Sequence, residues 1–452
     1  MKTNSTIIAA ILLSVILSPV ALAEGDSDQR PTFTKDIAPI LQENCVSCHR
    51  PGQIGPMPLQ TFDETRPWAK AIQKQVSNRT MPPWFAHPDS REMKGDLNLS
   101  DEQIDTIAAW VDQGTKRGNP SDMPEQRAFE TFEGGWQLGN PDIVMSYPLP
   151  NPVGKEVDDE YRCFPIELGL DHEVWLKGVE FQAGNSKVVH HFILFDDTTG
   201  TIPKMDAETP EPGCECGQMD TALATAEILQ MWAPGNLAPM PERGIAKRIK
   251  KGANLVLQIH YHNVTGADAI DHSQVALHLA KPDETIMKEM NGQLVSQWVL
   301  DIKAGDANSE HEARWVADRD ITAYSTGVHM HYRGKDMGLW ATTPGGEKET
   351  LIWVPNYDFN WQLSYEFVEP FKAPKGTELL MVSHHDNSEN NPHNPAIPPI
   401  DVKWGLATSD EMSFSGISFT YDDEALNITP QVPSAEVIAR LQGNGRVAKD
   451  SD

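Results

Sequence analysis

The chain has 452 residues and a formal net charge of −28, with 65 acidic side chains against 37 Lys and Arg. This charge argues against nucleic acid or an anionic membrane surface as a partner. Five cysteines are too few for a disulfide-rich scaffold. The length predicts two to three domains.

The first 23 residues are expected to be an export signal. Lys2 precedes an apolar run from Ile7 to Val20, and Ala21-Leu22-Ala23 supplies small residues at the cleavage position. The run is too short for a comfortable membrane span, which takes roughly 20 apolar residues, and no later segment approaches that length. The sequence therefore predicts a secreted protein without a membrane span.

Residues 31–118 have a helical, turn-rich pattern. Thr34 is expected to cap a helix whose apolar face runs from Ile37 to Leu41. A capping box at Ser100 to Gln103 opens a second amphipathic helix, and Gly114 is expected to end it. This part of the chain is therefore expected to form a small α-helical domain.

A polar stretch at Asn119-Pro120-Ser121 predicts a linker, and from Trp136 onward the helical period fades. Short apolar runs between turn residues then predict β-strands. The clearest runs cover residues 174–181, 188–195, 255–261, 323–332, 351–354, 379–382 and 412–421. Many strands separated by turns indicate sandwiches or jelly rolls.

The expected fold class is therefore multidomain, with the helical domain followed by two β-sandwich, jelly-roll-like domains. The β-domains are predicted at residues 136–281 and 284–424, separated at Lys281-Pro282-Asp283. Residues 425–452 are expected to be a weakly ordered tail with a short helix at Ser434 to Leu441.

Cys45-Val-Ser-Cys48-His49 has the spacing of c-type haem attachment. The two thiols add to the haem vinyl groups, and His49 becomes the proximal iron ligand. A methionine as the sixth ligand would raise the potential and suit electron transfer. Met81, held between prolines in Arg79-Thr-Met-Pro-Pro-Trp84, is the preferred candidate, with Met57 as its rival and His87 as a third.

This segment resembles the small cytochrome c domains fused to bacterial secreted enzymes. There too, a Cys-x-x-Cys-His-x-Pro-Gly stretch precedes an Arg-x-Met-Pro-Pro-Trp stretch. The resemblance covers about 90 residues and implies one covalently bound haem c.

Histidine pairs recur in the strand-rich region, at His190-His191, His260-Tyr-His262, His329-Met-His331 and His384-His385. Alternate residues of a strand share a face, so the second and third pairs can each chelate one ion. Adjacent residues point to opposite faces, so the first pair needs a strand end, a twist or a bulge. Imidazole suits copper, zinc, iron or nickel, so the histidines do not name the metal.

The order of these segments resembles the ascorbate-dependent type II copper monooxygenases, the family of peptidylglycine- and dopamine β-hydroxylating enzymes. Val188-Val-His-His-Phe-Ile-Leu-Phe195 resembles the family's His-His strand, and Leu255 to Tyr261 resembles the strand that adds a third histidine. Val328-His-Met-His-Tyr332 resembles the His-x-His of a second copper. Thr408-Ser-Asp-Glu-Met412 resembles the region that ends in its thioether ligand.

The resemblance implies two separate copper ions. An electron-transfer copper would be held by His190, His191 and His260, with His262 as an extra histidine. A catalytic copper that binds dioxygen would be held by His329, His331 and Met412. A thioether is a soft ligand that prefers Cu(I), which favours copper over zinc.

The sequence also departs from this family. Peptide-amidating members have an arginine two residues before the His-x-His, where this chain has Gly327, so peptide amidation is not expected. Most of the family's disulfides are missing, although one from Cys163 to either Cys214 or Cys216 is plausible. The segment Met381 to Asn394, which includes His384, His385 and His393, either lines a substrate mouth or is a polar loop.

The expected function is a monooxygenase that inserts one oxygen atom of O2 into a C–H bond of a small organic substrate. Electrons from an external cytochrome, quinol-linked protein or ascorbate-like reductant would pass through the haem to the three-histidine copper and then to the catalytic copper. Because both cofactors are loaded in the bacterial periplasm, that location is expected. Two alternatives are a non-catalytic haem and copper protein and a zinc or iron hydrolase, for which no carboxylate looks placed as general base.

Overall fold

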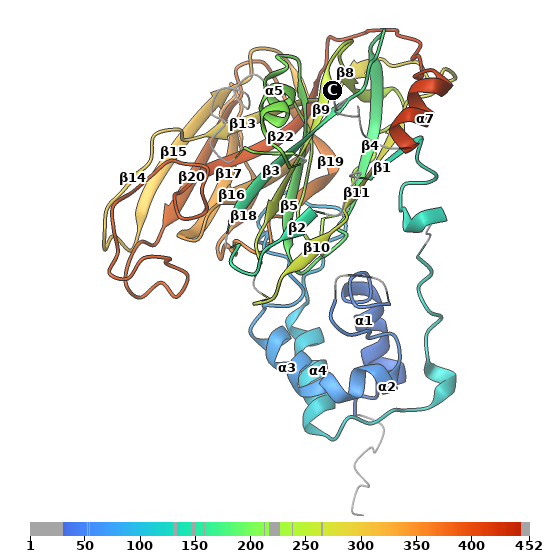
Figure 1. Ribbon diagram of the computed structural model, residues 1–452. Helices are drawn as coiled ribbons and strands as arrows, with labels where there is room; N and C mark the ends of the chain where they lie inside the picture. Colours follow the sequence, from blue (N-terminus) through green and yellow to red (C-terminus); the bar gives the residue numbers. More distant parts are fainter. Residues whose placement is uncertain are drawn as a thin grey trace, which may run out of the picture.

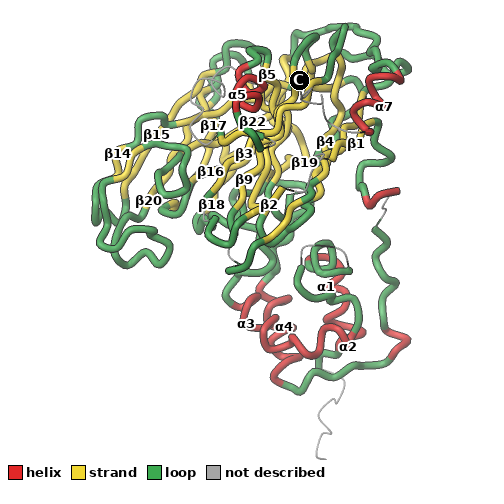
Figure 2. The backbone as a smooth tube through the Cα atoms, viewed as in Figure 1, coloured by secondary structure: helices red, strands yellow, loops and turns green. Residues whose placement is uncertain are grey.

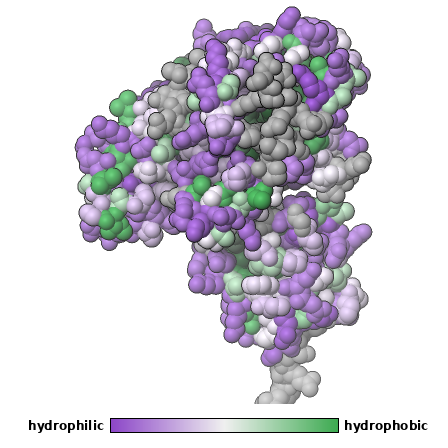
Figure 3. Space-filling model, in the orientation of Figure 1, coloured by the Kyte–Doolittle hydropathy of each residue, from purple (hydrophilic) through white to green (hydrophobic). Residues whose placement is uncertain are grey.

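The computed structural model describes residues 30–443 except 52, 54, 130–132, 147–150, 158, 212, 217–226, 237 and 264. A small helical region is followed by a mostly β region, as the sequence predicts (Figures 1 and 2). The visible face is largely hydrophilic, in keeping with the acidic composition (Figure 3). None of the described helices has the length and apolar character that crossing a bilayer requires. The predicted export signal lies outside the described residues.

The helical region packs around a small core that contains Phe33, Leu41 and Trp110. Its helices are a π-helix at Phe33–Ile37, α1 (Ala38–Asn44), α2 (Phe62–Thr65), a 3-10 turn at Arg66–Trp68, α3 (Ala69–Ser77) and α4 (Asp101–Asp112). Ser100 and Gln103 form the predicted capping box of α4.

The predicted cap at Thr34 is wrong. The π-helix already begins at Phe33, and Thr32 occupies the cap position. The reason is local, because the Asp36 carboxylate accepts a hydrogen bond from the Thr32 backbone amide at 2.7 Å. Thr34 is instead buried inside the turn.

Two sheets with a common core form what we call the first sheet pair. Within the described residues their strand orders are β1-β11-β4-β8-β12 and β6-β3-β9-β5-β7, and β2 pairs separately with β10. Leu255, Leu257 and Ile259 of β9 face the shared core. Gln258 and His260 alternate with these residues and therefore point away from it.

The elements of this part are β1 (Ile143–Ser146), β2 (Asn151–Val153), β3 (Glu160–Glu167), β4 (Val174–Gln182), β5 (Val189–Asp197), α5 (Thr201–Glu208), β6 (Cys214–Glu215), β7 (Glu227–Trp232), β8 (Ile245–Ile249), β9 (Asn254–Tyr261), β10 (Ala269–Asp271), β11 (Gln274–Leu279) and β12 (Lys288–Glu289). Because β12 pairs with β8, the chain leaves the first sheet pair only after Glu289.

The second sheet pair has strand orders β13-β22-β16-β19 and β15-β20-β17-β18 in the described part of the chain, and β14 pairs separately with β21. Val328 and Met330 of β16 lie in its core. His329 alternates with them and therefore lies on the outer face of the sheet.

The strands of this part are β13 (Asn291–Ser296), β14 (Asp301–Ile302), β15 (Ser309–Val316), β16 (Ile321–Met330), β17 (Gly334–Thr342), β18 (Lys348–Val354), β19 (Ser364–Ala373), β20 (Glu378–His385), β21 (Val402–Lys403) and β22 (Ser413–Tyr421). The long apolar runs picked out in the sequence fall on β16, β18, β20 and β22.

A loop of the helical region, Trp84–Lys94, packs against β18 and β19; we call it the contact loop. The backbone amide of His87 donates to the Trp353 carbonyl at 2.7 Å. The amide of Arg91 donates to Thr350, and that of Lys94 donates to Glu366, both at 2.8 Å. This loop fixes the helical region on the second sheet pair.

The last described helix, α7 (Ala435–Gly443), returns to the first sheet pair and lies beside β1 (Figure 1). Leu441 is 3% exposed and belongs to the core of that sheet pair. Arg440 also donates to the carbonyl of Leu168. The described part of the tail is therefore packed, which corrects the expectation of a weakly ordered segment.

Replacing Leu441 with Ala should lower the free energy of unfolding by about 2–5 kcal/mol, because the change leaves a cavity in the core. Urea unfolding followed by tryptophan fluorescence measures the loss. The matched control is Val432→Ala, since Val432 is 38% exposed. Equal unfolding curves for the two variants would show that α7 does not stabilise the sheets.

Candidate metal centres

Three histidines from β5 and β9 meet on the outer face of the first sheet pair. The two strands are antiparallel, and their register shifts between Val189 and His191, which is opposite His260. This bulge turns adjacent histidines toward the same partner strand. The Nδ1 atom of His191 lies 3.1 Å from Nδ1 of His190 and 3.4 Å from Nδ1 of His260. Together the three rings form a cluster that could hold a metal ion.

The surroundings of His260 fix the direction of its ring. Its Nε2 atom is hydrogen-bonded to a carboxylate oxygen of Asp159. The other oxygen of Asp159 accepts from the Thr408 amide at 2.7 Å. The ring of Tyr161 stacks on His260 at a centroid distance of 4.2 Å. Since Nε2 is committed to the carboxylate, Nδ1 is left to face the other histidines.

His329 and His331 form a second cluster at the end of β16. Nδ1 of His329 donates to Oε1 of Gln362 at 2.6 Å. The amide nitrogen of Gln362 donates to the Phe359 carbonyl, which fixes the orientation of the Gln362 amide. Nδ1 of His331 donates to the Asp410 carbonyl at 3.3 Å. Both rings therefore keep Nε2 available to a metal.

Met412 immediately precedes β22, the strand that pairs with β16. The pairing of β22 with β16 places Phe414 opposite His329, where the two rings stack at 4.6 Å. The last pair of this ladder is Met330–Ser413, so continuing the register by one residue would bring Met412 opposite His331. Directly opposed residues of antiparallel strands share a face. The pairing of β16 with β22 thus brings the chain segments that carry His329, His331 and Met412 next to each other.

Burial keeps the histidines of both clusters uncharged. Loss of water contact lowers the pKa of His190 to about 3 and that of His329 to about 4. The pKa values of His191 and His331 fall well below the ordinary value, for the same reason and because neighbouring rings repel a second charge. Neutral imidazole is the form that binds metal ions.

A buried polar network anchors the turn before Met412. The Glu411 carboxylate accepts from the backbone amides of His331 at 2.9 Å and Arg333 at 2.6 Å. Burial raises the pKa of Glu411 to about 8. Arg333 in turn donates to Asn387, which also accepts from Asn394.

These contacts decide between the two interpretations of residues 381–394. His385 and Asn387 are fully buried. His384 is hydrogen-bonded to Asp336 and Glu310. The segment therefore packs against the turn that carries Met412. This favours a polar loop over a substrate mouth.

The ring of Phe359 contacts both histidine clusters. Phe359, in the loop between β18 and β19, stacks on His190 at 4.6 Å with an interplanar angle of 15°. The same ring is 6.1 Å from the ring of His331. In the same loop, Gln362 accepts from the side chain of Asn236 at 3.1 Å through its backbone carbonyl. The loop thus connects the two sheet pairs between the clusters.

The haem-attachment residues follow α1. Cys45 and Cys48 are free thiols that are partly buried. Nδ1 of His49 donates to the Met57 carbonyl at 3.0 Å, which leaves Nε2 as the atom available to iron. A Cβ atom on Gly55 would lie 2.7 Å from Nδ1 of His49, so only glycine lets the loop lie this close to the ring.

The Met57 contact bears on the choice of the sixth ligand. Its carbonyl lies on the Nδ1 side of His49, which is the side away from the iron. The Met57 side chain packs against the core of the helical region. His87 is also disfavoured, because its ring packs against Trp353 at 4.3 Å in the contact loop. Met81 is the candidate that these contacts leave.

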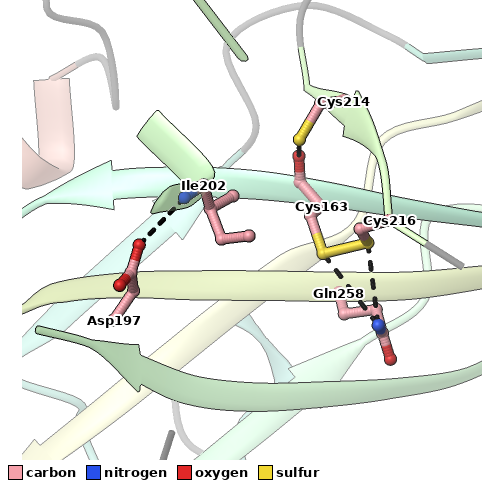
Figure 4. Close-up of a disulfide and its surroundings, with 6 residues drawn as sticks. All are labelled: Cys163, Asp197, Ile202, Cys214, Cys216 and Gln258. Atoms are coloured by element: carbon pink, nitrogen blue, oxygen red, sulfur yellow. Dashed lines mark hydrogen bonds between the residues drawn. A yellow bond between two sulfur atoms is a disulfide. The ribbon is translucent and has the colours of Figure 1, made fainter. Parts of the chain in front are cut away.

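The disulfide left open by the sequence joins Cys163 of β3 to Cys216, with an S–S distance of 2.09 Å (Figure 4). Cys214 stays a buried free thiol whose sulfur lies 3.9 Å from the Cys163 carbonyl. The Gln258 amide lies 3.6 Å from the Cys216 sulfur (Figure 4).

Comparison with known proteins gives two kinds of match. A family model described as cytochrome c matches residues 35–115. The human "DBH-like monooxygenase protein 1" is 22% identical over 77% of this chain and 59% of its own length. The Drosophila melanogaster "MOXD1 homolog 1" is also 22% identical, over 50% of this chain and 36% of its own length.

The chain thus spans less than two thirds of these curated relatives. Among solved structures, the VP2 subviral particle of infectious bursal disease virus aligns with 64% of this chain and 73% of that chain. Its TM-score is 0.19 at 8% identity, which is too slight a likeness to inform the fold.

Replacing Asp159 with Asn should weaken copper binding by the three-histidine cluster about 10- to 100-fold, because His260 loses the carboxylate that orients its ring. Copper titration followed by competition with a chelator measures the affinity. Asp318→Asn is the matched control, since Asp318 is exposed on the surface. An affinity equal to that of the control would show that Asp159 does not support the ligand.

Replacing Met81 with Ala should lower the reduction potential of the haem, because a thioether ligand raises it. The Met57→Ala variant should keep the native potential. Redox titration followed in the visible spectrum compares the two. A potential that falls in the Met57 variant and not in the Met81 variant would reverse the assignment.

Proposed function

We propose that this chain, a homologue of the DBH-like monooxygenases fused to a cytochrome c domain, is a copper-dependent monooxygenase. It would insert one oxygen atom of O2 into a C–H bond of a small organic substrate. Its electrons would enter through a covalent haem c from an external donor, and its location would be the periplasm. The observation that carries the proposal is the ladder between β16 and β22, which ends next to His331 and Met412.

The three-histidine cluster fits a copper ion. Its ring nitrogens converge within 4.8 Å, and Nε2 of His190 is buried without a hydrogen-bond partner. Buried polar nitrogens without partners cost stability, and a shared ion would supply their missing interaction. A carboxylate behind a ligating histidine, as Asp159 stands behind His260, is the usual support of such a ligand.

The second site fits copper through the chemistry of its donor set. His329 and His331 offer Nε2 atoms that their hydrogen bonds leave free. A thioether such as that of Met412 is a soft ligand that Cu(I) accepts and Zn(II) rarely chooses. The network around Glu411 holds the turn that carries Met412 in place.

Bound copper would supply one-electron redox chemistry and the reduction of dioxygen, and bound haem would supply single electrons. The protein's own residues do the rest. His49 and the two thiols would hold the haem on the helical region. Phe359 fills the space between the clusters and excludes water from it, since the ring is only 7% exposed.

The hydrolase alternative lacks a suitable base. Two carboxylates hydrogen-bonded to residues of the clusters are those of Asp159 and Glu411. Asp159 is bonded to His260 and Thr408, and Glu411 is bonded to backbone amides beneath the site. Neither is free to activate a water molecule.

Replacing Met412 with Ala should lower product formation by at least about 10-fold, because a copper ligand is lost. The haem spectrum should not change. Turnover of copper-loaded protein under labelled dioxygen with a panel of compounds, scored for label in the product, measures the effect.

Met240→Ala is the matched control, since Met240 is 44% exposed. Elemental analysis should find two copper ions and one iron per chain. Folded protein that binds iron without copper, or a Met412 variant as active as the control, would contradict the proposal. A native protein that exchanges electrons and yields no labelled product would favour the non-catalytic alternative.

A further inference from the structure

The contact loop connects the cytochrome domain to the start of β19. The ring of Trp84 meets that of Tyr365 edge-on at a centroid distance of 4.9 Å. Tyr365 is 2% exposed, and its hydroxyl group faces the backbone of Phe85 and Ala86. Trp84 follows Met81, the candidate haem ligand, by three residues. The loop that would hold the haem iron is therefore the one that contacts the second sheet pair.

From Tyr365, a short path leads to His329. Three residues back along the chain, Gln362 accepts the hydrogen bond of His329 Nδ1 at 2.6 Å. Tyr365 also pairs with Thr326 in the ladder between β19 and β16, and His329 lies three residues further along β16. Two bonded routes thus connect the same aromatic contact to the same histidine.

The three-histidine cluster lies beyond this point. In the described part of the chain, the hydrogen bonds from residues 30–118 to the sheets go to β18 and β19, and none goes to β5 or β9. The ring that stacks on His190 is Phe359, which belongs to the same loop as Gln362. An electron from the cytochrome domain would therefore reach the three-histidine cluster through the loop between β18 and β19, whose Gln362 is hydrogen-bonded to His329.

Building on the proposed function, we propose that Trp84, Tyr365 and Gln362 conduct electrons from the cytochrome domain to the His329/His331/Met412 site first. Phe359 then connects this site to His190. In the first step one electron leaves the ferrous haem iron, which becomes ferric, and one Cu(II) becomes Cu(I). No bond is made or broken and no proton moves. This order reverses the sequence-based expectation, in which the three-histidine copper is reduced before the other.

The order can be tested without substrate or oxygen. Ferrous haem is mixed anaerobically with stoichiometric Cu(II) bound to the same chain, and its oxidation is followed by stopped-flow absorbance. His260→Ala should keep the fast phase, with one electron transferred. His331→Ala should lose it. Elemental analysis and the haem spectrum confirm that each variant lacks one copper and keeps its haem.

The opposite pattern, with the fast phase lost in the His260 variant and kept in the His331 variant, overturns the inference. So does slow haem oxidation in native protein that still incorporates labelled oxygen with an external reductant; the monooxygenase activity then stands, but electron entry through the haem does not. A native protein that binds no copper overturns both.

The aromatic contact has its own test in the same experiment. Trp84→Leu should lose the fast phase, whereas Trp84→Phe, which keeps a ring against Tyr365, should retain it. Trp68→Leu is the matched control, because Trp68 lies in the helical region and is 46% exposed. If Trp84→Leu oxidises its haem as fast as the control, the contact does not carry the electron.

Discussion

One carboxylate, that of Asp159, holds the two halves of the candidate centre together. It accepts from His260 in the first sheet pair and from the Thr408 amide in the second. Burial alone would raise the pKa of Asp159, but these hydrogen bonds lower it, so the group stays charged. The Asp159 side chain is 23% exposed, and both of its oxygens have hydrogen-bond partners. The bond pattern therefore fixes both the ring of His260 and the position of the Thr408–Met412 turn.

The local features of this centre could be predicted because strands repeat every two residues. The alternation at Leu255–Tyr261 and at Val328–Tyr332 separates core from outer-face side chains, and the structure keeps that separation. Because His190 and His191 are adjacent, both can face one metal ion only where the strand is irregular. The register shift in β5 is such an irregularity. The predicted resemblance to a DBH-like monooxygenase with a fused cytochrome c domain is confirmed by the comparisons.

The contacts between distant segments could not be predicted. Phe359, Gln362 and Asp159 carry no motif, and each becomes relevant only when its loop meets a strand far away in the sequence. The packing of α7 was missed because a short amphipathic helix near a chain end does not reveal which surface covers it. The predicted cap at Thr34 is wrong because the Asp36 carboxylate accepts from the Thr32 amide, so that the helix begins before Thr34.

The chain crosses between the two sheet pairs more than once. It leaves the first pair after β12, and on the way to α7 it pairs Ile428 with Ile286 before Leu441 enters the first core. A domain hinge is normally a few residues that absorb a large rotation. Here a rotation of one sheet pair against the other would have to break the contacts of both crossings at the same time. A molecule that reaches the clusters would therefore pass side chains and rim loops, and the two crossings resist a change in the spacing between the clusters.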